Sequence, residues 1–408
     1  MRAFLSSIVL RGRVIATLLP LSRPIPMLQA VRVLFRIALV TALCGIAHLG
    51  CGQRGDDKEI LIGEYSSLTG TAATFGTSTH KGAMLAVDGA NAGGGIAGRK
   101  VRLLTEDTQS KPEEAATVVT KLINRDGVIA LVGEVASSRS LAAAPICQAN
   151  GVPMITPSST NPKVTQVGDY IFRVCFLDDF QGDVIARYIR NSLKMTRVAI
   201  LKDVKNEYSV GLAQLFSESF RKMNGVIVGE QAFSEGDIDF KAQLTALKAT
   251  NAEIIFVPGY YGEAAMIVKQ GRELNITIPF IGGDGWDSAK LLEIGGAAME
   301  GAYYCNHYST EDPREVVQNF VQKFRTKYNE TPDAIAALSY DAVRILFGAI
   351  RACGTTDGPK LRDAIAATRN FDGVTGTITI SSERNATKSA VILTIKNGKL
   401  LQKETIRP

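Results

Sequence analysis

Short apolar runs alternate with longer amphipathic stretches from Ile60 onward, and this alternation limits the folds open to the chain. The apolar runs predict β-strands at 60–65, 101–105, 128–135, 154–156, 170–175, 198–201, 226–228, 254–257 and 280–282. The amphipathic stretches predict helices at 75–91, 112–125, 138–148, 180–193, 208–223, 240–249, 263–274 and 288–294. Because strands separated by helices pair in parallel and are covered on both faces, the pattern predicts an α/β fold with parallel sheets.

The later part of the chain changes character. Two long helices are predicted at 313–328 and 333–352 and a shorter one at 359–367, followed by strands at 376–380 and 391–395. These elements have no core of their own, so we expect them to complete two sheets already begun. A chain of 408 residues is also too long for a single ordinary core and suits two lobes.

Residues 1–51 have the features of an export signal. An apolar run at 37–50 follows two arginines and is shorter than the roughly 20 residues that span a bilayer. Its end resembles a bacterial lipoprotein cleavage box, which implies lipidation of Cys51; plain secretion and an uncleaved anchor stay open. Residues 52–57 form a polar tether. We therefore expect a protein of the periplasm or the outer face of the cell membrane, with contact to the membrane only through the lipid anchor.

The net charge of +6 comes from the leader, which holds six arginines and no acidic residue. The remaining 40 basic residues equal the 40 acidic ones, so no basic surface for nucleic acid is expected. Outside residues 1–51, the four cysteines match no metal framework and are expected as free thiols, with one or two disulfides as the alternative. With only two histidines beyond the leader and no nucleophile motif, we expect no enzyme activity, no metal site and no cofactor.

Two turns rich in hydroxyl side chains follow neighbouring predicted strands. The first begins at Ala136 and Ser137, and the second contains Ser158, Ser159 and Thr160. Free backbone N–H groups and a helix N-terminus attract anions, and ligands of open parallel sheets lie beyond the carboxyl ends of the strands. These turns are therefore predicted to hold a small carboxylate, although ordinary helix capping explains the same residues.

Aromatic and acidic side chains follow the strands of the second group. Tyr208, Tyr260, Asp284 and Trp286 each come shortly after a predicted strand end. If both sheets open on a common cleft, an acid opposite an anion site suits an ammonium opposite a carboxylate, which is the outline of an amino acid. Packing of the aromatic residues and capping by Asp284 are the alternatives.

Several motifs, in this order and spacing, resemble those of one known family. They lie at 68–70 with 75–76, 91–98, 155–162, 172–173 with 178–182, and 282–286. The chain resembles the branched-chain amino-acid (leucine/isoleucine/valine) type of periplasmic substrate-binding protein that serves ABC transporters, over nearly all of residues 58–400. The resemblance implies the type I periplasmic binding protein fold, in which two Rossmann-like lobes are joined by a three-crossing hinge.

The resemblance also implies boundaries and roles. The first lobe would hold residues 58–177 and 307–388, and the second 178–306 and 389–408. Ser137, Ser158 and Thr160 would hold the ligand carboxylate and part of its ammonium, Tyr208 and Tyr260 would close from the other lobe, and Asp284 would bind the ammonium. The pocket is further expected to include Phe75, where the family often has Tyr, together with Ala136, Ser159 and Trp286.

The expected protein is a monomeric receptor without enzyme activity. It would capture an apolar amino acid, as branched-chain ones are, and deliver it to an ABC permease with its ATPase subunits. The alternative is the same fold binding an amide, urea-like or aromatic small molecule, as a transport receptor or a sensor.

Overall fold

The computed structural model describes residues 59–408. The export signal, the lipidation of Cys51 and the tether at 52–57 lie outside the described residues and stay predictions. Within the described part of the chain, no helix is both long enough and apolar enough to cross a membrane.

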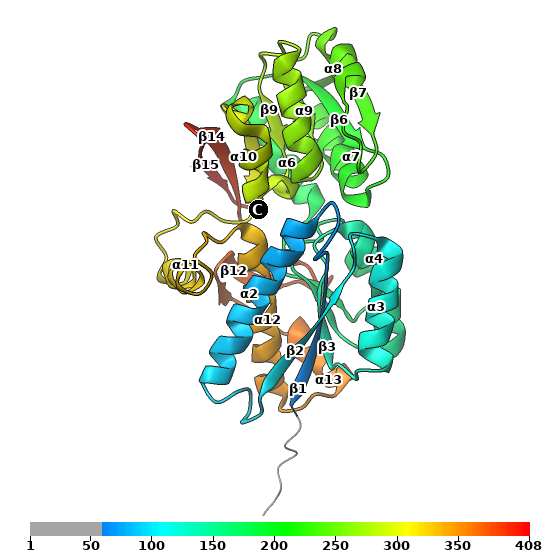
Figure 1. Ribbon diagram of the computed structural model, residues 1–408, viewed down its shortest axis with the longest axis vertical. Helices are drawn as coiled ribbons and strands as arrows, with labels where there is room; N and C mark the ends of the chain where they lie inside the picture. The colour runs from blue at the N-terminus through cyan, green and yellow to red at the C-terminus, as the bar shows by residue number, and fades with distance from the viewer. Residues whose placement is uncertain (1–58) are drawn as a thin grey trace, which may run out of the picture. The chain divides into compact units, whose positions relative to one another are not determined.

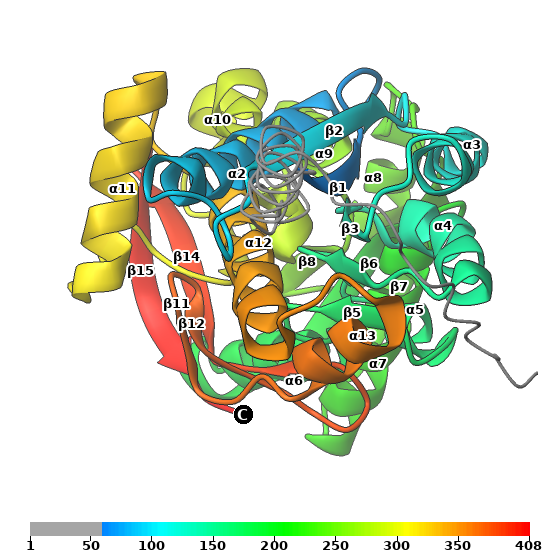
Figure 2. The same ribbon diagram turned by 90° about the horizontal axis from the view of Figure 1, so that it is seen from below.

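The first lobe is built on a parallel sheet with the strand order β2-β1-β3-β4-β5. Its strands are β1 (Ile60–Ser66), β2 (Val101–Asp107), β3 (Ala130–Gly133), β4 (Met154–Thr156) and β5 (Ile171–Arg173). The helices around it are α2 (Ala73–Ala92), α3 (Pro112–Asn124), α4 (Ser137–Asn150), α5 (Lys163–Gln166), α11 (Glu315–Tyr328), α12 (Ala334–Cys353) and α13 (Gly358–Ala366). Figure 2 shows α2 and α12 on one side of this sheet and α3 and α4 on the other, so both faces are covered.

The second lobe is built on a mixed sheet with the order β15-β14-β10-β9-β8-β6-β7. Its strands are β6 (Arg197–Asp203), β7 (Val226–Phe233), β8 (Ile254–Val257), β9 (Phe280–Gly282), β10 (Tyr303–Asn306), β14 (Ala390–Lys396) and β15 (Lys399–Ile406). Its helices, mostly green in Figure 1, are α6 (Asp178–Arg187), α7 (Glu207–Lys222), α8 (Lys241–Lys248), α9 (Tyr261–Glu273) and α10 (Ala289–Gly295), with short turns η1 (Tyr188–Ser192), η2 (Asp284–Trp286) and η3 (Gly296–Met299). The predicted α/β fold with parallel sheets is confirmed.

One sequence expectation about the late strands is wrong. The strand at 376–380 does not join the first sheet, because β12 (Gly376–Ile380) pairs antiparallel with β11 (Phe371–Gly373) and β13 (Ala386–Thr387) in a separate small sheet. The other late strand does return as expected, since β14 pairs with β10 in the second sheet.

The chain passes between the lobes three times. It leaves the first sheet after β5, returns after β10, and leaves the small sheet after β13 to enter β14. These crossing segments contain Phe176, His307 and Lys388, all of them buried. The hinge therefore carries polar groups inside the protein.

The lobes also share apolar contacts. The buried cluster of the second lobe includes Phe75, Val135 and Ile335, which belong to first-lobe elements or to the loop after β3. Since apolar side chains of one lobe are packed into the core cluster of the other, the structure is a closed form.

Candidate ligand-binding site

A small cavity lies where the two lobes meet, and it brings together most of the aromatic and acidic residues predicted for the site. It is lined by Phe75, Val135, Ser158, Tyr208, Tyr260, Asp284, Gly285 and Ile335. Its volume of about 10 Å³ is room for about one water molecule. Larger cavities of about 820 and 580 Å³ lie elsewhere among the described residues. Of these three, the small one is lined both by residues at the carboxyl ends of second-sheet strands and by Ser158 of a hydroxyl turn. We therefore take it as the candidate site.

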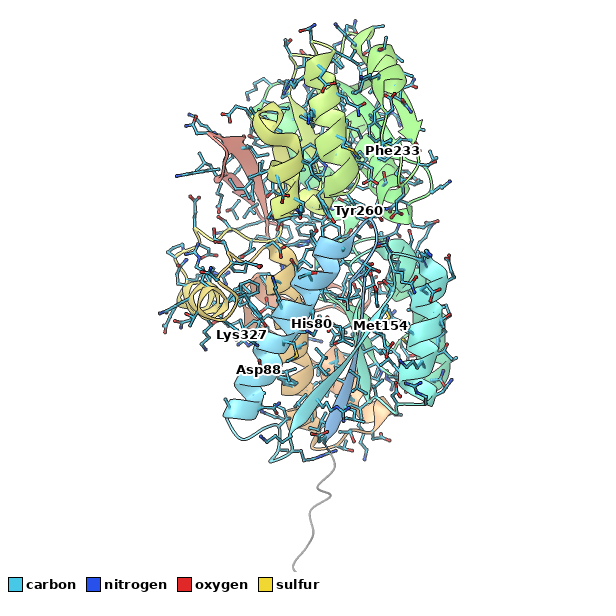
Figure 3. The ribbon with its side chains drawn as sticks, in the orientation of Figure 1. His80, Asp88, Met154, Phe233, Tyr260 and Lys327 are labelled. Carbon is cyan, nitrogen blue, oxygen red and sulfur yellow. The ribbon has the colours of Figure 1, made fainter. Side chains whose placement is uncertain are left out.

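Parallel neighbouring strands place the second-lobe residues at one edge. Strand β8 pairs in parallel with β6 and β9, so the segments that follow these strands emerge together. Tyr208 lies in the first turn of α7, Tyr260 immediately precedes α9, and Asp284 opens the turn η2. Tyr260 lies where the two lobes meet (Figure 3).

The aromatic residues form one wall. The rings of Tyr208 and Tyr260 are stacked with centroids 5.4 Å apart, and Phe75 meets Tyr260 edge-on at 5.4 Å. Gly285 allows this wall to close, because a Cβ there would lie 2.7 Å from the Gly259 carbonyl oxygen and 2.9 Å from Tyr260 Cδ1. The Tyr208 hydroxyl accepts a hydrogen bond from the Gly285 N–H at 3.2 Å.

Asp284 is the acidic group of the cavity, and it is 3% exposed. Its Oδ1 accepts a hydrogen bond from Gln181 Nε2 at 3.0 Å. Its Oδ2 lies 2.9 Å from His307 Nε2 and 3.4 Å from Ser158 Oγ. The backbone N–H of Asp284 also donates to Gln181 Oε1 at 2.7 Å, so the carboxylate is fixed from several sides.

The hydroxyl residues of the first lobe have different surroundings. Ser158 lines the cavity and donates to Asp284 across the lobes. Ser159 instead donates to the carbonyl of Glu134 at 2.9 Å, and Ser137 Oγ accepts from the Asn161 N–H at 3.3 Å. Thr160 Oγ1 is buried and interacts with the Asp178 carboxyl group without a hydrogen bond of ordinary geometry.

Two other predicted residues lie beside the cavity without lining it. The Ala136 N–H donates to the Glu134 carboxylate at 2.8 Å. Trp286 is fully buried in the second-lobe core, where its Nε1 donates to the Val257 carbonyl at 3.0 Å. Of the predicted set, then, Phe75, Ser158, Tyr208, Tyr260 and Asp284 converge, while Ala136, Ser137, Ser159, Thr160 and Trp286 lie behind them.

A buried carboxylate that the sequence analysis missed lies beside the first turn. Glu134 accepts hydrogen bonds from Ser67 Oγ, from Thr108 Oγ1 at 3.1 Å and from the Ala136 N–H. One amide that the sequence predicted for a bound anion is therefore bonded to the protein itself. The sequence did contain a signal for this site: Glu134 lies at the end of an apolar run, and a charged side chain buried there needs hydrogen-bond partners.

An arginine holds the second turn in place. Arg173, at the end of β5, is fully buried and donates to the backbone carbonyls of Ser159 and, at 2.8 Å, Asn161. Its Nε donates to Asn385 Oδ1 at 2.8 Å. Because the guanidinium group binds carbonyls on both sides of Thr160, it holds the backbone of the second turn.

Further functional candidates come from the hinge and from α6. His307 and Gln181 contact Asp284, and neither was predicted as a site residue. His307 is one of two histidines in the described chain, and that rarity was the available signal. Asp178, at the start of α6, accepts from Gln181 Nε2 at 3.2 Å. Burial, and then the charge of Asp284, raise the pKa of Asp178 well above its ordinary value.

None of the four cysteines in residues 59–408 lines the cavity. Cys147, Cys175 and Cys305 are buried free thiols and Cys353 is a half-buried one. The expectation of free thiols is confirmed for residues 59–408, and burial raises the pKa of Cys175 to about 12.

Comparison with known proteins identifies the family. The family model described as periplasmic binding protein matches residues 59–399. An amino acid binding protein from Pseudomonas aeruginosa is 33% identical over 305 residues, covering 74% of this chain and 81% of that protein.

Two solved structures are also similar. A leucine-binding protein from Thermotoga maritima is 38% identical with a TM-score of 0.83, covering 86% of this chain and 99% of that one. A branched-chain amino acid transporter substrate-binding protein from Streptococcus pneumoniae, solved with isoleucine, is 36% identical with a TM-score of 0.82, covering 86% and 100%. The predicted two-lobed fold and the predicted resemblance are confirmed, and the chain belongs to the periplasmic binding protein family.

Proposed function

We propose that this protein is an exported receptor, without enzyme activity, that captures an apolar α-amino acid between its lobes and delivers it to an ABC permease. One observation carries the proposal: a buried carboxylate, Asp284, that uncharged groups hold in a cavity with aromatic and aliphatic walls. Such a carboxylate attracts a cation, and the walls favour an apolar body attached to that cation.

Each end of an amino acid has a partner in this arrangement. The ammonium group would bind Asp284, and the aliphatic side chain would pack against Phe75, Val135 and Ile335. The carboxylate would bind Ser158 and free N–H groups of the two first-lobe turns. Ser137, Ser159, Thr160 and Ala136 would shape these turns, and Trp286 would support Asp284 from the second-lobe core.

Capture requires the lobes to separate. A cavity of about 10 Å³ is smaller than any amino acid, so the ligand must enter an open form. In the closed form the lobes are joined by hydrogen bonds from Thr71 Oγ1 to Glu235 at 2.6 Å and from Asn161 Nδ2 to the Glu207 carbonyl at 2.7 Å. Arg139 Nη2 also reaches Glu235 at 3.1 Å. A ligand that bridges both lobes shifts the equilibrium toward a closed form whose cavity is wide enough to hold it.

The relatives support the choice of ligand and of location. Leucine and isoleucine are named for the similar Thermotoga and Streptococcus proteins. A periplasmic or outer membrane-face location, lipidation of Cys51, a monomeric state, and lobes bounded at 58–177 with 307–388 and at 178–306 with 389–408 belong to the same proposal.

A thermal-shift screen followed by calorimetric titration tests it. The panel holds leucine, isoleucine and valine, the des-amino analogue 4-methylpentanoate, and a set of amides, urea compounds and benzoates. A ligand at a hundred times its Kd adds about 2.7 kcal/mol of stability. We expect the branched-chain amino acids to give the largest shifts. A shift with an amide, urea compound or benzoate and none with any amino acid would replace the proposal with its alternative.

A further inference from the structure

The groups that form hydrogen bonds with the Asp284 carboxylate are either uncharged or, in the case of His307, have an uncharged form. Gln181 contributes an amide and Ser158 a hydroxyl. Among the described residues, the only basic side chain within 4.0 Å of the Asp284 carboxylate is His307. The hydroxyl of Tyr208 also interacts with this carboxylate. Together these donors orient Asp284, because an ionised carboxylate accepts about four hydrogen bonds. Whether its negative charge is available to a ligand depends on the charge of His307.

The surroundings of His307 favour the neutral ring. Its side chain is fully buried and stacks on Phe176, with ring centroids 3.7 Å apart and planes at 25°. A carboxylate only accepts hydrogen bonds, so Nε2 carries the proton that points at Asp284. Nδ1 is buried and has no hydrogen-bond partner among the described residues, so a proton there would have no acceptor. Burial lowers the pKa of His307 to about 4, although the hydrogen bond to Asp284 acts in the opposite direction.

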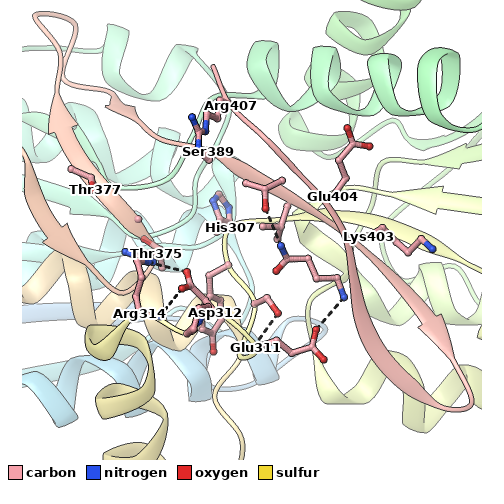
Figure 4. Close-up of a pocket in the computed structure, with 17 residues that line it drawn as sticks. His307, Glu311, Asp312, Arg314, Thr375, Thr377, Ser389, Lys403, Glu404 and Arg407 are labelled. Carbon is pink, nitrogen blue, oxygen red and sulfur yellow. Dashed lines mark hydrogen bonds and ion pairs between the residues drawn. The ribbon is translucent and has the colours of Figure 1, made fainter.

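Of the other charged groups around His307, Lys388 also favours the neutral ring. Apart from Asp178, the remaining ones line the large cavity on the outer side of His307. The positive charge of Lys388, in the third crossing, lowers the pKa of His307. Among the described residues, Asp284 is the only acidic hydrogen-bond partner of His307. Asp178 shares the Gln181 amide with Asp284, and the charges of the two carboxylates also interact directly. On its outer side His307 lines the cavity of about 820 Å³ in Figure 4, whose charged residues are Glu311, Asp312, Arg314, Lys403, Glu404 and Arg407. Acids and bases are equal in number there.

We propose that His307 is a positioning residue: as the neutral Nε2–H form it orients Asp284 from the hinge and leaves the whole carboxylate charge for the ammonium group of the ligand. This inference rests on the proposed function for the identity of the ligand. A protonated His307 would place a second cation on the same carboxylate and weaken the contact with the ligand. Histidine at this position therefore selects amines over their des-amino analogues without lining the small cavity of the candidate site.

A matched pair of variants separates orientation from packing. In His307→Gln the amide nitrogen reaches the position of Nε2, whereas in His307→Asn the same amide is one methylene shorter and stops near Nδ1. We expect His307→Gln to bind leucine within about threefold of the wild type. His307→Asn should lose about tenfold for leucine and change little for 4-methylpentanoate, because that compound has no ammonium group. Equal leucine affinities of the two variants, or equal losses for both compounds, would overturn the proposal.

Histidine nitrogen NMR of the full chain measures the protonation directly. Only three histidines are present, so the His307→Gln and His80→Gln spectra assign the two that the structure describes. Between pH 8 and 5.5 we expect His307 to stay neutral with its proton on Nε2, and the leucine Kd to change less than about twofold. His80, whose pKa the hydrogen bond to Glu64 raises, should titrate in the same samples and serves as the internal reference.

The binding measurements and the NMR measurement test different claims, so one can fail without the other. A charged His307 at pH 6, or a proton on Nδ1, would refute the positioning role whatever the ligand is. If no amino acid binds the wild type, the proposed function is wrong, and the NMR result still decides which form of His307 faces Asp284.

Discussion

The two lobes bring different kinds of polar group to the cavity between them. On the first lobe, two of the hydroxyl side chains of the turns bond within the lobe: Ser159 to the Glu134 carbonyl and Ser137 to the Asn161 N–H. On the second lobe, Asp284 reaches into the cavity and toward the other lobe, where Ser158 meets it. The hydroxyl residues at the strand ends thus divide between structural contacts and the site, whereas the acid Asp284 at the same kind of position faces the site.

The largest test of this difference is Asp284→Asn. Removing the charge leaves the ammonium of an amino acid without a counter-ion in a buried site, so we expect leucine affinity to fall about 100-fold, or ~3 kcal/mol. Calorimetric titration measures the change. Asp341→Asn is the control, since Asp341 is equally buried but accepts from the Val374 and Thr375 N–H groups away from the cavity. It should lower stability and leave leucine affinity unchanged; the reverse pattern would contradict the assignment of Asp284.

The comparison extends to a second place where the lobes meet with carboxylates on both sides. Asp287 of the second lobe accepts from the Ala334 N–H at 2.6 Å, beside Asp333, which caps α12 in the first lobe. Burial and the charge of Asp287 raise the pKa of Asp333 to about 7. Because the folded protein holds the Asp333 proton more tightly than the unfolded chain does, protonated Asp333 stabilises the fold at low pH. This contribution to the free energy of unfolding is lost as the pH rises from about 4, the ordinary pKa, through about 7, the pKa in the folded protein.

Asp333→Asn keeps the helix cap and removes the titration. At pH 8 the variant should be more stable than the wild type by about 2 kcal/mol, and near pH 4 the two should be equal. Urea unfolding at both pH values measures this. Asp357→Asn, at the exposed cap of α13, should show no such pH dependence. A constant offset at both pH values would mean that Asp333 does not titrate in this range.

Adjacent serines give a smaller and sharper test. Ser158→Ala removes a side chain that lines the cavity, so leucine affinity should fall by fivefold to tenfold, about 1 kcal/mol, with little change in Tm. Ser159→Ala breaks the bonds to the Glu134 carbonyl and to Ser140 Oγ, so stability should fall by about 1–2 kcal/mol with affinity within about twofold. If Ser159→Ala lost affinity and Ser158→Ala did not, the roles assigned to the two positions would be exchanged.

The smallest effect is expected at Tyr260. Its hydroxyl is buried and interacts with Asn206 without a hydrogen bond of ordinary geometry, so Tyr260→Phe should change the free energy of unfolding by no more than about 0.5 kcal/mol. Tyr208→Phe, in contrast, leaves the Gly285 N–H without its acceptor and should cost about 1 kcal/mol. Urea unfolding of both variants measures the difference. A larger loss for Tyr260→Phe would show that its hydroxyl has a partner that the closed form hides.

Residue types and spacing predicted much of this fold. Apolar runs such as Ile254–Val257 and Phe280–Gly282 lie at their predicted positions because a strand buried on both faces needs a continuous apolar run. Strand β15 was missed because it is mostly exposed and its polar sequence, KLLQKETI, has no such run. The prediction that β12 joins one of the two large sheets was wrong, because its sequence indicates a strand but not the sheet in which that strand pairs.

The sequence by itself determined the family, the two sheets and the strand ends that carry Tyr208, Tyr260 and Asp284, because parallel strands deliver their carboxyl ends to one edge. Tertiary structure decided which of those side chains meet. The hydroxyls of Ser137 and Ser159 turn to backbone groups of their own lobe, and His307 and Gln181 reach Asp284 from a crossing segment and from α6. Such contacts join residues as far apart as Gln181 and Asp284, and only the packing of the elements within and between the lobes determines them.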